Sequence, residues 1–175
     1  MQHIIKTVIS GLAISSIALG LYACQPQPYS VVVPMMFKKV PQEMDYLHSQ
    51  GVDIVDLGQS IRLVFPSDRF FLGTSATLAP HKTQVLEQVA AFASHYPQAH
   101  IYITGYNDRV LTNHKAKKQS LAKAEAIAGF LWNDGLPTNH MTVRGKGYVA
   151  PLNNMQTPKA SSENRRVEMV LTPIY

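Results

Sequence analysis

The sequence has a single cysteine, Cys24, so it can form no disulfide within the chain. It also lacks a G-x-S-x-G motif, a phosphate-binding loop and any pair of histidines four residues apart. These patterns are typical of nucleophilic catalysis, nucleotide binding and helical metal sites. We therefore expect a protein that is not an enzyme and that needs no cofactor and no metal.

Charge is scarce as well. Charged residues make up 15% of the sequence and hydrophobic residues 46%, which is too little charge for a disordered chain. The net charge of +5 suits an anionic neighbour such as a lipid headgroup or a cell-wall polymer. No basic run with interleaved aromatic residues occurs, so we expect no nucleic-acid partner. The densest basic cluster, Lys115, Lys117 and Lys118, is explained most simply as the solvated face of a helix.

The first 23 residues have the order of charge and hydrophobicity that is typical of a signal peptide. Lys6 and the amino terminus form a positive end, and the stretch from Val8 to Ala23 carries no charge. A membrane-spanning helix needs roughly 20 apolar residues, so this stretch is short for a permanent anchor. The sequence therefore predicts a leader that is removed; an uncleaved anchor that ends in Cys24 is the alternative.

The leader ends in Leu21-Tyr22-Ala23-Cys24, which resembles the lipobox of bacterial lipoproteins, although Tyr22 stands where a small residue is usual. The resemblance implies cleavage before Cys24 and lipidation of its sulfur, with acyl chains such as palmitate holding the protein on a bilayer. Gln25 stands where an Asp typically retains lipoproteins at the inner membrane. We therefore expect a lipid-anchored protein on the periplasmic face of the outer membrane.

The mature chain divides into a tether and a folded part. Four prolines within residues 24–41 exclude a helix there and favour an extended tether. A short helix and a connecting strand are expected over residues 42–60, and the main domain over residues 61–175. We find no internal repeat.

Hydrophobic periodicity predicts alternating helices and strands in the folded part. Such an order is typical of an α/β fold in which the helices pack on one face of a small mixed sheet. The polar stretch 150–163 is expected to form a loop. The predicted helices cover residues 41–50, 80–94 and 115–132, and the predicted strands are a pair within 52–65, then 101–104, 141–144 and one through Val167, Met169 and Leu171.

Four sequence blocks between Phe65 and Leu171 resemble the OmpA C-terminal family of peptidoglycan-binding domains. They are F-L-G-T-S-A-T-L-A-P at 71–80, I-Y-I-T-G-Y-N-D at 101–108, R-G-K-G-Y at 144–148 and N-R-R-V-E at 164–168. The blocks occur in the family's order and with its spacing. The resemblance implies the family's two-layer fold, with helices on one face of the sheet, and peptidoglycan as a partner.

The resemblance also implies a set of binding residues. In the family an Asp holds the ammonium of diaminopimelate in the wall peptide, and an Arg fifteen residues later holds the carboxylate on the same carbon. Here Asp108 supplies the acid, but Lys123 stands at the position of the Arg. Lysine offers a point charge and not a planar fork, so the exchange is not conservative. Asn107, Arg165 and Arg166 are further candidates from the matching blocks.

A second resemblance concerns the arrangement of the whole chain. The lipobox, the Pro-rich tether, the short helix before Gly51 and the altered acid motif also resemble the IcmN/DotK lipoproteins of Dot/Icm type IVB secretion systems. This resemblance implies a structural subunit of an outer-membrane complex, with other envelope proteins as partners and weak or absent wall binding. Lys123 favours this alternative over an unmodified wall anchor.

Lipidation can be tested directly. We expect the Cys24→Ala substitution to abolish labelling with radioactive palmitate and to leave the precursor unprocessed, because no other thiol is present in the chain. Gel mobility and palmitate incorporation measure both effects. A Cys24→Ala protein that is still cleaved after Ala23 and still sediments with membranes contradicts the lipoprotein assignment.

Overall fold

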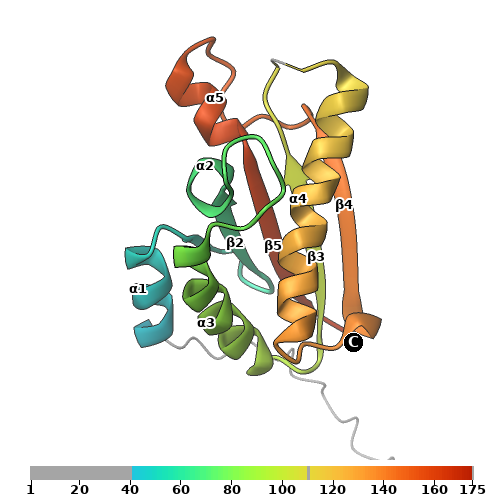
Figure 1. The fold of residues 1–175 in the computed structure, drawn as a ribbon. Helices are drawn as coiled ribbons and strands as arrows, with labels where there is room; N and C mark the ends of the chain where they lie inside the picture. The colour runs from blue at the N-terminus through green and yellow to red at the C-terminus, as the bar shows by residue number, and fades with distance from the viewer. Residues whose placement is uncertain (1–40, 110, 175) are drawn as a thin grey trace, which may run out of the picture. The chain divides into compact units, whose positions relative to one another are not determined.

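The computed structural model describes residues 41–109 and 111–174, so the expected signal peptide, Cys24 and the tether before Pro41 lie outside the described residues. The described chain forms a five-stranded sheet with the strand order β1-β2-β5-β3-β4 (Figure 1). Strands β3 and β4 pair in parallel, and every other neighbouring pair is antiparallel. The strands are β1 Asp53–Asp56, β2 Ile61–Pro66, β3 Ala99–Tyr106, β4 Met141–Gly147 and β5 Arg166–Pro173.

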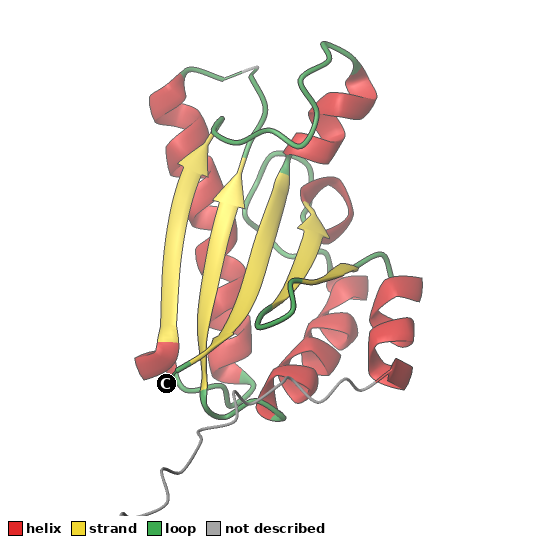
Figure 2. Cartoon of the chain, turned by 180° about the vertical axis from the view of Figure 1, so that it is seen from behind, coloured by secondary structure: helices red, strands yellow, loops and turns green. Residues whose placement is uncertain are grey.

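The longer helices cover one face of the sheet, and Figure 2 shows the opposite face, with the strands in front of them. The fold is therefore the expected α/β arrangement of helices on a mixed sheet. In the part of the chain that is described, no helix is both long and apolar enough to cross a bilayer. The helices are α1 Pro41–Ser49, α2 Ser67–Phe70, α3 Thr83–Ser94, α4 Asn113–Asn133 and α5 Pro158–Asn164, with 3₁₀ turns at Pro80–Lys82 and Thr138–His140.

The hydrophobic core lies between the sheet and these helices. Alternate residues of β2, β3 and β5 point into it, and α3 contributes the residues of its predicted inner face. Leu47 of α1 and Val52, which precedes β1, are fully buried in the same core. The first helix and the hairpin therefore pack as parts of one core with the rest of the described chain.

Two predicted boundaries are wrong. The strand expected to stop at Gly105 continues to Tyr106, and its parallel neighbour continues to Gly147. The stretch 150–163, expected to be a loop, contains α5. Pro158 stands in the first turn of α5, and the Thr157 hydroxyl accepts a hydrogen bond from the Ala160 amide at 3.1 Å. A proline in the first turn and a threonine N-cap are standard signals for the start of a helix. The local sequence therefore contained the signals for α5, and the prediction of a loop overlooked them.

Glycines in β3 and β4 let α4 lie directly on the sheet. A Cβ atom at Gly105 would stand 1.9 Å from the Ser120 carbonyl oxygen, and one at Gly145 would stand 2.5 Å from Leu121. No side chain fits in either place. The Ser120 hydroxyl, on the same turn of α4, accepts a hydrogen bond from the Gly147 amide at 2.9 Å. This contact sets the height of α4 above the carboxyl ends of β3 and β4.

We expect Gly105→Ala to lower the free energy of unfolding by about 3 kcal/mol, because the added methyl group must push α4 away from β3. The matched control is Gly129→Ala, since a methyl group added at Gly129 in α4 would meet no other atom within 4 Å. That change should stabilise the helix by about 0.5–1 kcal/mol. Chemical denaturation measures both values, and equal effects of the two substitutions would disprove the close packing of α4.

Candidate functional site

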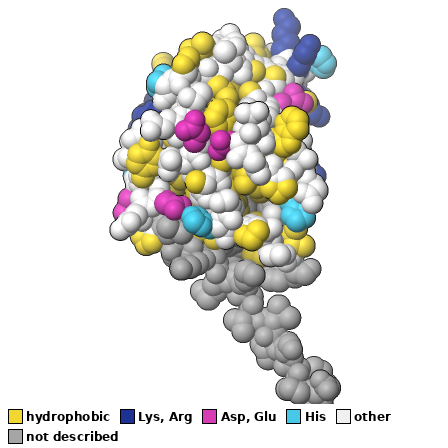
Figure 3. Space-filling model, turned by 60° about the horizontal axis from the view of Figure 1, so that its bottom comes forward, with side chains coloured by type: hydrophobic (Ala, Val, Ile, Leu, Met, Phe, Trp, Pro, Cys, Tyr) yellow, Lys and Arg dark blue, Asp and Glu magenta, His cyan; other side chains and the backbone are white. Residues whose placement is uncertain are grey.

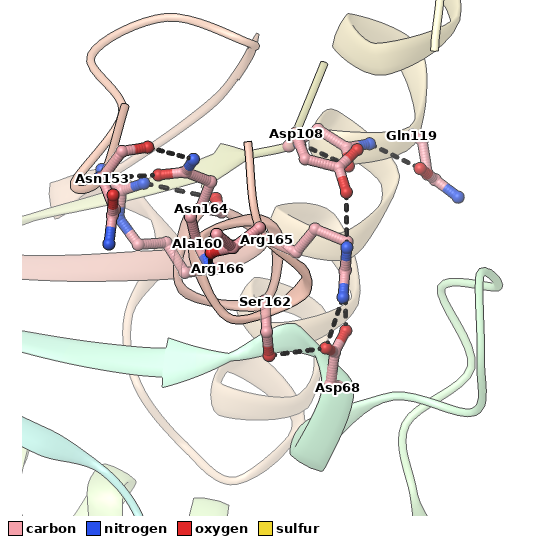
Figure 4. Close-up of polar contacts among 11 residues, drawn as sticks. Asp68, Asp108, Gln119, Asn153, Ala160, Ser162, Asn164, Arg165 and Arg166 are labelled. Atoms are coloured by element: carbon pink, nitrogen blue, oxygen red, sulfur yellow. Dashed lines mark hydrogen bonds and ion pairs between the residues drawn. The ribbon is translucent and has the colours of Figure 1, made fainter. Parts of the chain in front are cut away.

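Four charged residues from separate elements meet near the carboxyl end of β3. Asp108 lies two residues beyond β3, Lys123 lies on α4, and Arg165 lies between α5 and β5. Asp68 lies in α2, directly after β2. The expected placement of Asp108 at a strand end, with Lys123 on the next helix, is what the structure shows. Figure 4 shows Arg165 reaching towards both Asp68 and Asp108.

The Arg165 guanidinium lies between two carboxylates. Its Nε and Nη2 donate to the two oxygens of Asp68 at 2.9 and 2.6 Å, and its Nη1 donates to Oδ2 of Asp108. The Ser162 hydroxyl donates to Asp68 at 2.8 Å. These hydrogen bonds raise the pKa of Arg165 and lower the pKa of Asp68 below its ordinary value of 3.8. Both groups are therefore charged at neutral pH.

Asp108 and Lys123 are buried, and only 4% of each residue is exposed. Burial lowers the pKa of Lys123 and the Arg165 charge adds to this effect, whereas the carboxylates of Asp68 and Asp108 oppose it. The Lys123 ammonium lies 5.2 Å from the centre of the Phe71 ring, a distance at which the ring face attracts a cation. Two acids and two bases thus form a cluster with no formal net charge.

Asn107 positions Asp108. Its side-chain oxygen accepts a hydrogen bond from the Asp108 amide at 2.9 Å, and its own amide donates to the Gly147 carbonyl at 2.9 Å. Its side-chain nitrogen donates to Gln119, which in turn donates to the Thr74 carbonyl. Asn107 therefore connects the end of β3 to β4, to α4 and to the loop before α3.

Arg166 lies outside the charged cluster. Its guanidinium donates to Glu168 at 2.7 Å and to the carbonyl oxygens of Asn164 and Ala150 at 3.2 and 3.1 Å. It also stacks on the Tyr106 ring, 4.0 Å from the ring centre. The Arg165 and Arg166 guanidinium groups have different hydrogen-bond partners, so the two residues do not act together. The role of Arg166 in ligand binding stays a prediction, and its contacts hold the segment that leads into α5.

An open cavity of about 460 Å³ adjoins Asp108. Arg109 and Tyr148 line one part of it, and Arg109 stacks on the Tyr148 ring at 4.7 Å. The rest of the lining lies between Asn153 and Asn164 and combines polar side chains with the apolar Met155 and Pro158. Asn164 keeps this wall in place, because its amide nitrogen donates to the Asn153 carbonyl at 2.8 Å and its oxygen accepts from the Asn153 amide at 3.1 Å. The arrangement offers a buried acid and neighbouring cations to a small polar ligand.

Asp68 was not among the predicted site residues. It reaches Arg165 because β2 pairs with β5 in a register that sets Pro66 opposite Arg166, and because the Ser67 amide donates to the Arg165 carbonyl at 2.8 Å. Only knowledge of this strand pairing could have revealed it. Within the described ranges, no group of three metal-ligating side chains occurs.

The sequence profile of the OmpA family matches residues 70–165 of the chain, which is more than half of its length. The chain is 28% identical over 130 residues to the probable lipoprotein YiaD of Escherichia coli, covering 74% of this chain and 59% of YiaD. It is 30% identical to the peptidoglycan-binding protein ArfA of Mycobacterium tuberculosis, covering 66% of this chain and 36% of ArfA. The chain thus spans only part of the length of these two relatives.

Similarity to the outer-membrane lipoprotein YfiB of Pseudomonas aeruginosa extends over nearly the whole chain. The identity is 25%, with 97% of this chain and 96% of YfiB covered. Among solved structures, the cell-wall anchor of the type VI secretion system of Pseudomonas aeruginosa has a TM-score of 0.69 at 20% identity. This match covers 78% of the present chain and 98% of the anchor. At this identity the match shows a shared fold.

The ion pairs of Asp68 should make stability depend on pH. Because the pKa of Asp68 is lowered in the folded protein, its contribution is complete above pH 3.8 and is lost as the pH falls further. We expect Asp68→Asn to lower the free energy of unfolding by about 1 kcal/mol at pH 7, since the pair is partly exposed, and the difference to shrink below pH 3.8. The control is Asp45→Asn, which removes the charge of an exposed aspartate in α1. A difference that stays constant down to about pH 2.5, roughly one unit below the ordinary pKa of an aspartate, contradicts the assignment.

Proposed function

Because the chain belongs to the OmpA family, we propose that its domain binds the peptide stem of peptidoglycan beside Asp108 and anchors the outer membrane to the cell wall. The neutral cluster of two carboxylates and two cations beside an open cavity is the observation that carries this proposal. The peptidoglycan-binding lipoproteins of the family, and the name of the relative ArfA, support the same ligand.

The cluster complements a ligand that bears an ammonium and a carboxylate on one carbon, as diaminopimelate does. The ligand ammonium would take the place of Arg165 Nη1 at Asp108. Arg165 would remain fixed by its two hydrogen bonds to Asp68, and its released N–H could then donate to the ligand carboxylate. Lys123 would add a second positive charge to the same carboxylate. No charge of protein or ligand would be left without a partner.

The position of the cluster in the fold suits this function. The described chain begins with α1, which Figure 1 shows below α5, whereas Asp108 follows the carboxyl end of β3 and Arg165 follows α5 at the upper end of the sheet. An extended tether over residues 24–41 would span about 50 Å at roughly 3.1 Å per residue. With lipidation at Cys24, a tether of this length would let the domain stand off the outer membrane.

A second candidate function is a structural subunit of a type IVB secretion complex, in which the domain mainly contacts other envelope proteins. Two observations favour weak wall binding. Lys123 replaces the forked guanidinium of the family, and Asp108 already pairs with Arg165, so a ligand must displace an ion pair to bind. The two functions are compatible, since a secretion complex also needs a place in the wall.

Sedimentation with purified peptidoglycan sacculi tests the proposed site. Asp108→Ala should weaken binding by about thirtyfold or more, because the ligand ammonium loses its partner at a cost of roughly 2–5 kcal/mol. Lys123→Arg should tighten binding about tenfold by restoring a forked donor to the carboxylate. Asp134→Ala, an exposed acid just beyond α4, is the control and should have no effect.

The same experiment separates the two functions. A protein that sediments before any substitution supports the wall anchor. A protein that sediments only after Lys123→Arg supports the secretion subunit. If neither Asp108→Ala nor Lys123→Arg alters sedimentation, the cluster is not the binding site.

A further inference from the structure

A second cavity, of about 730 Å³, lies between the first half of α4 and strand β4. Lys117 and Lys118 of α4 and Arg144 and Lys146 of β4 line it, and no acidic residue is among its lining residues. We call this cavity the basic groove. The basic groove and the cavity beside Asp108 share no lining residue, so they are separate. They are neighbours in the sequence, because Tyr148 lines the cavity beside Asp108 and Val149 lines the basic groove.

The positive charge of the basic groove is not neutralised by acids of the described residues. All four cations are exposed, and none of them forms an ion pair within the portion of the chain that the structure describes. The side chains of Lys117 and Lys118 therefore repel those of Arg144 and Lys146 unless a ligand or solvent ions intervene. Such a concentration of one sign of charge around a cavity attracts anions.

The start of α4 adds to the same field. This helix has 21 residues, its first turn contains no acidic residue, and the side chain of its N-cap residue, Thr112, makes no capping hydrogen bond. The N-terminal end of a helix carries a partial positive charge and free amide groups, so acids are favoured there and lysines are not. The chain instead places lysines beside this end, an arrangement that a bound anion would stabilise.

We propose that the basic groove binds carboxylate groups of the wall polymer, on a stem peptide next to the one held at Asp108. This inference rests on the proposed function and names a second contact for it. The groove lies at the same end of the domain as the Asp108 cluster, because it is built from the start of α4 and the end of β4 (Figure 1). The opposite end, turned forward in Figure 3, shows dark-blue Lys and Arg side chains mainly at its margins. Because the groove and the proposed wall site share one end of the domain, a wall polymer is favoured as the ligand of the groove.

The test uses the full chain in detergent and a soluble probe, fluorescently labelled oligo-D-glutamate, which has carboxylates but no side-chain ammonium to pair with Asp108. We expect the double substitution Lys117→Gln and Lys118→Gln to weaken probe binding about fivefold. The reason is that two exposed charge contacts, together worth about 1 kcal/mol, are lost. The matched control neutralises two exposed lysines outside the groove, Lys115→Gln with Lys159→Gln, and should change binding less than twofold.

Asp108→Asn should leave probe binding unchanged while reducing sedimentation with sacculi. The two measurements therefore test the groove and the proposed function separately. The proposed function fails if Asp108→Asn does not change sedimentation with sacculi. Equal losses in the groove variant and the control variant, or no probe binding at all, would overturn the assignment of the groove. Tighter binding of an oligophosphate probe than of oligo-D-glutamate would overturn the choice of carboxylates and assign the groove to phosphate-bearing polymers.

Discussion

The guanidinium of Arg165 joins three segments that lie far apart in the sequence. Its hydrogen bonds to Asp68 and Asp108 connect α2, the end of β3 and the start of β5. The burial of Asp108 is tolerable only because a cation reaches it, since an unpaired carboxylate in this position would cost several kcal/mol. The position of the Asp108 carboxylate beside the cavity depends on this bridge.

The bridge would also explain how the proposed wall-binding site could work with Lys123 in place of an arginine. A fork that could hold a carboxylate is already present in Arg165, kept in position by Asp68 on one side. Binding would then be an exchange of one ion pair for two. The ion pairs of the free protein already compensate the charges of the cluster, so a ligand would have to displace one of them in order to bind. This balance is why strong wall anchoring and weak, accessory wall binding are both consistent with the same geometry.

Much of the fold could be predicted from local patterns, because α3 follows the period of a helix and Ile61, Leu63 and Phe65 of β2 follow that of a strand. The end of β3 was predicted wrongly at Gly105, because a glycine within a strand pattern suggested that the strand ends there. In the structure the strand continues, and the absence of a side chain at Gly105 leaves room for the Ser120 backbone of α4. Asp108 and Arg165 were predicted from the family blocks, and Lys123 from its spacing of fifteen residues from Asp108. Asp68 was missed because its position follows from the pairing of β2 with β5, which neither local periodicity nor the blocks reveal.

We propose that the Asp108 cluster recognises an ammonium and a carboxylate on one carbon. The most direct measurement is competition for binding to sacculi between free meso-diaminopimelate and pimelate, which has the same seven-carbon diacid skeleton without the amino groups. We expect meso-diaminopimelate to release the protein from sacculi and pimelate at the same concentration not to release it. Equal release by the two compounds, or release by neither from a protein that sediments, would contradict it.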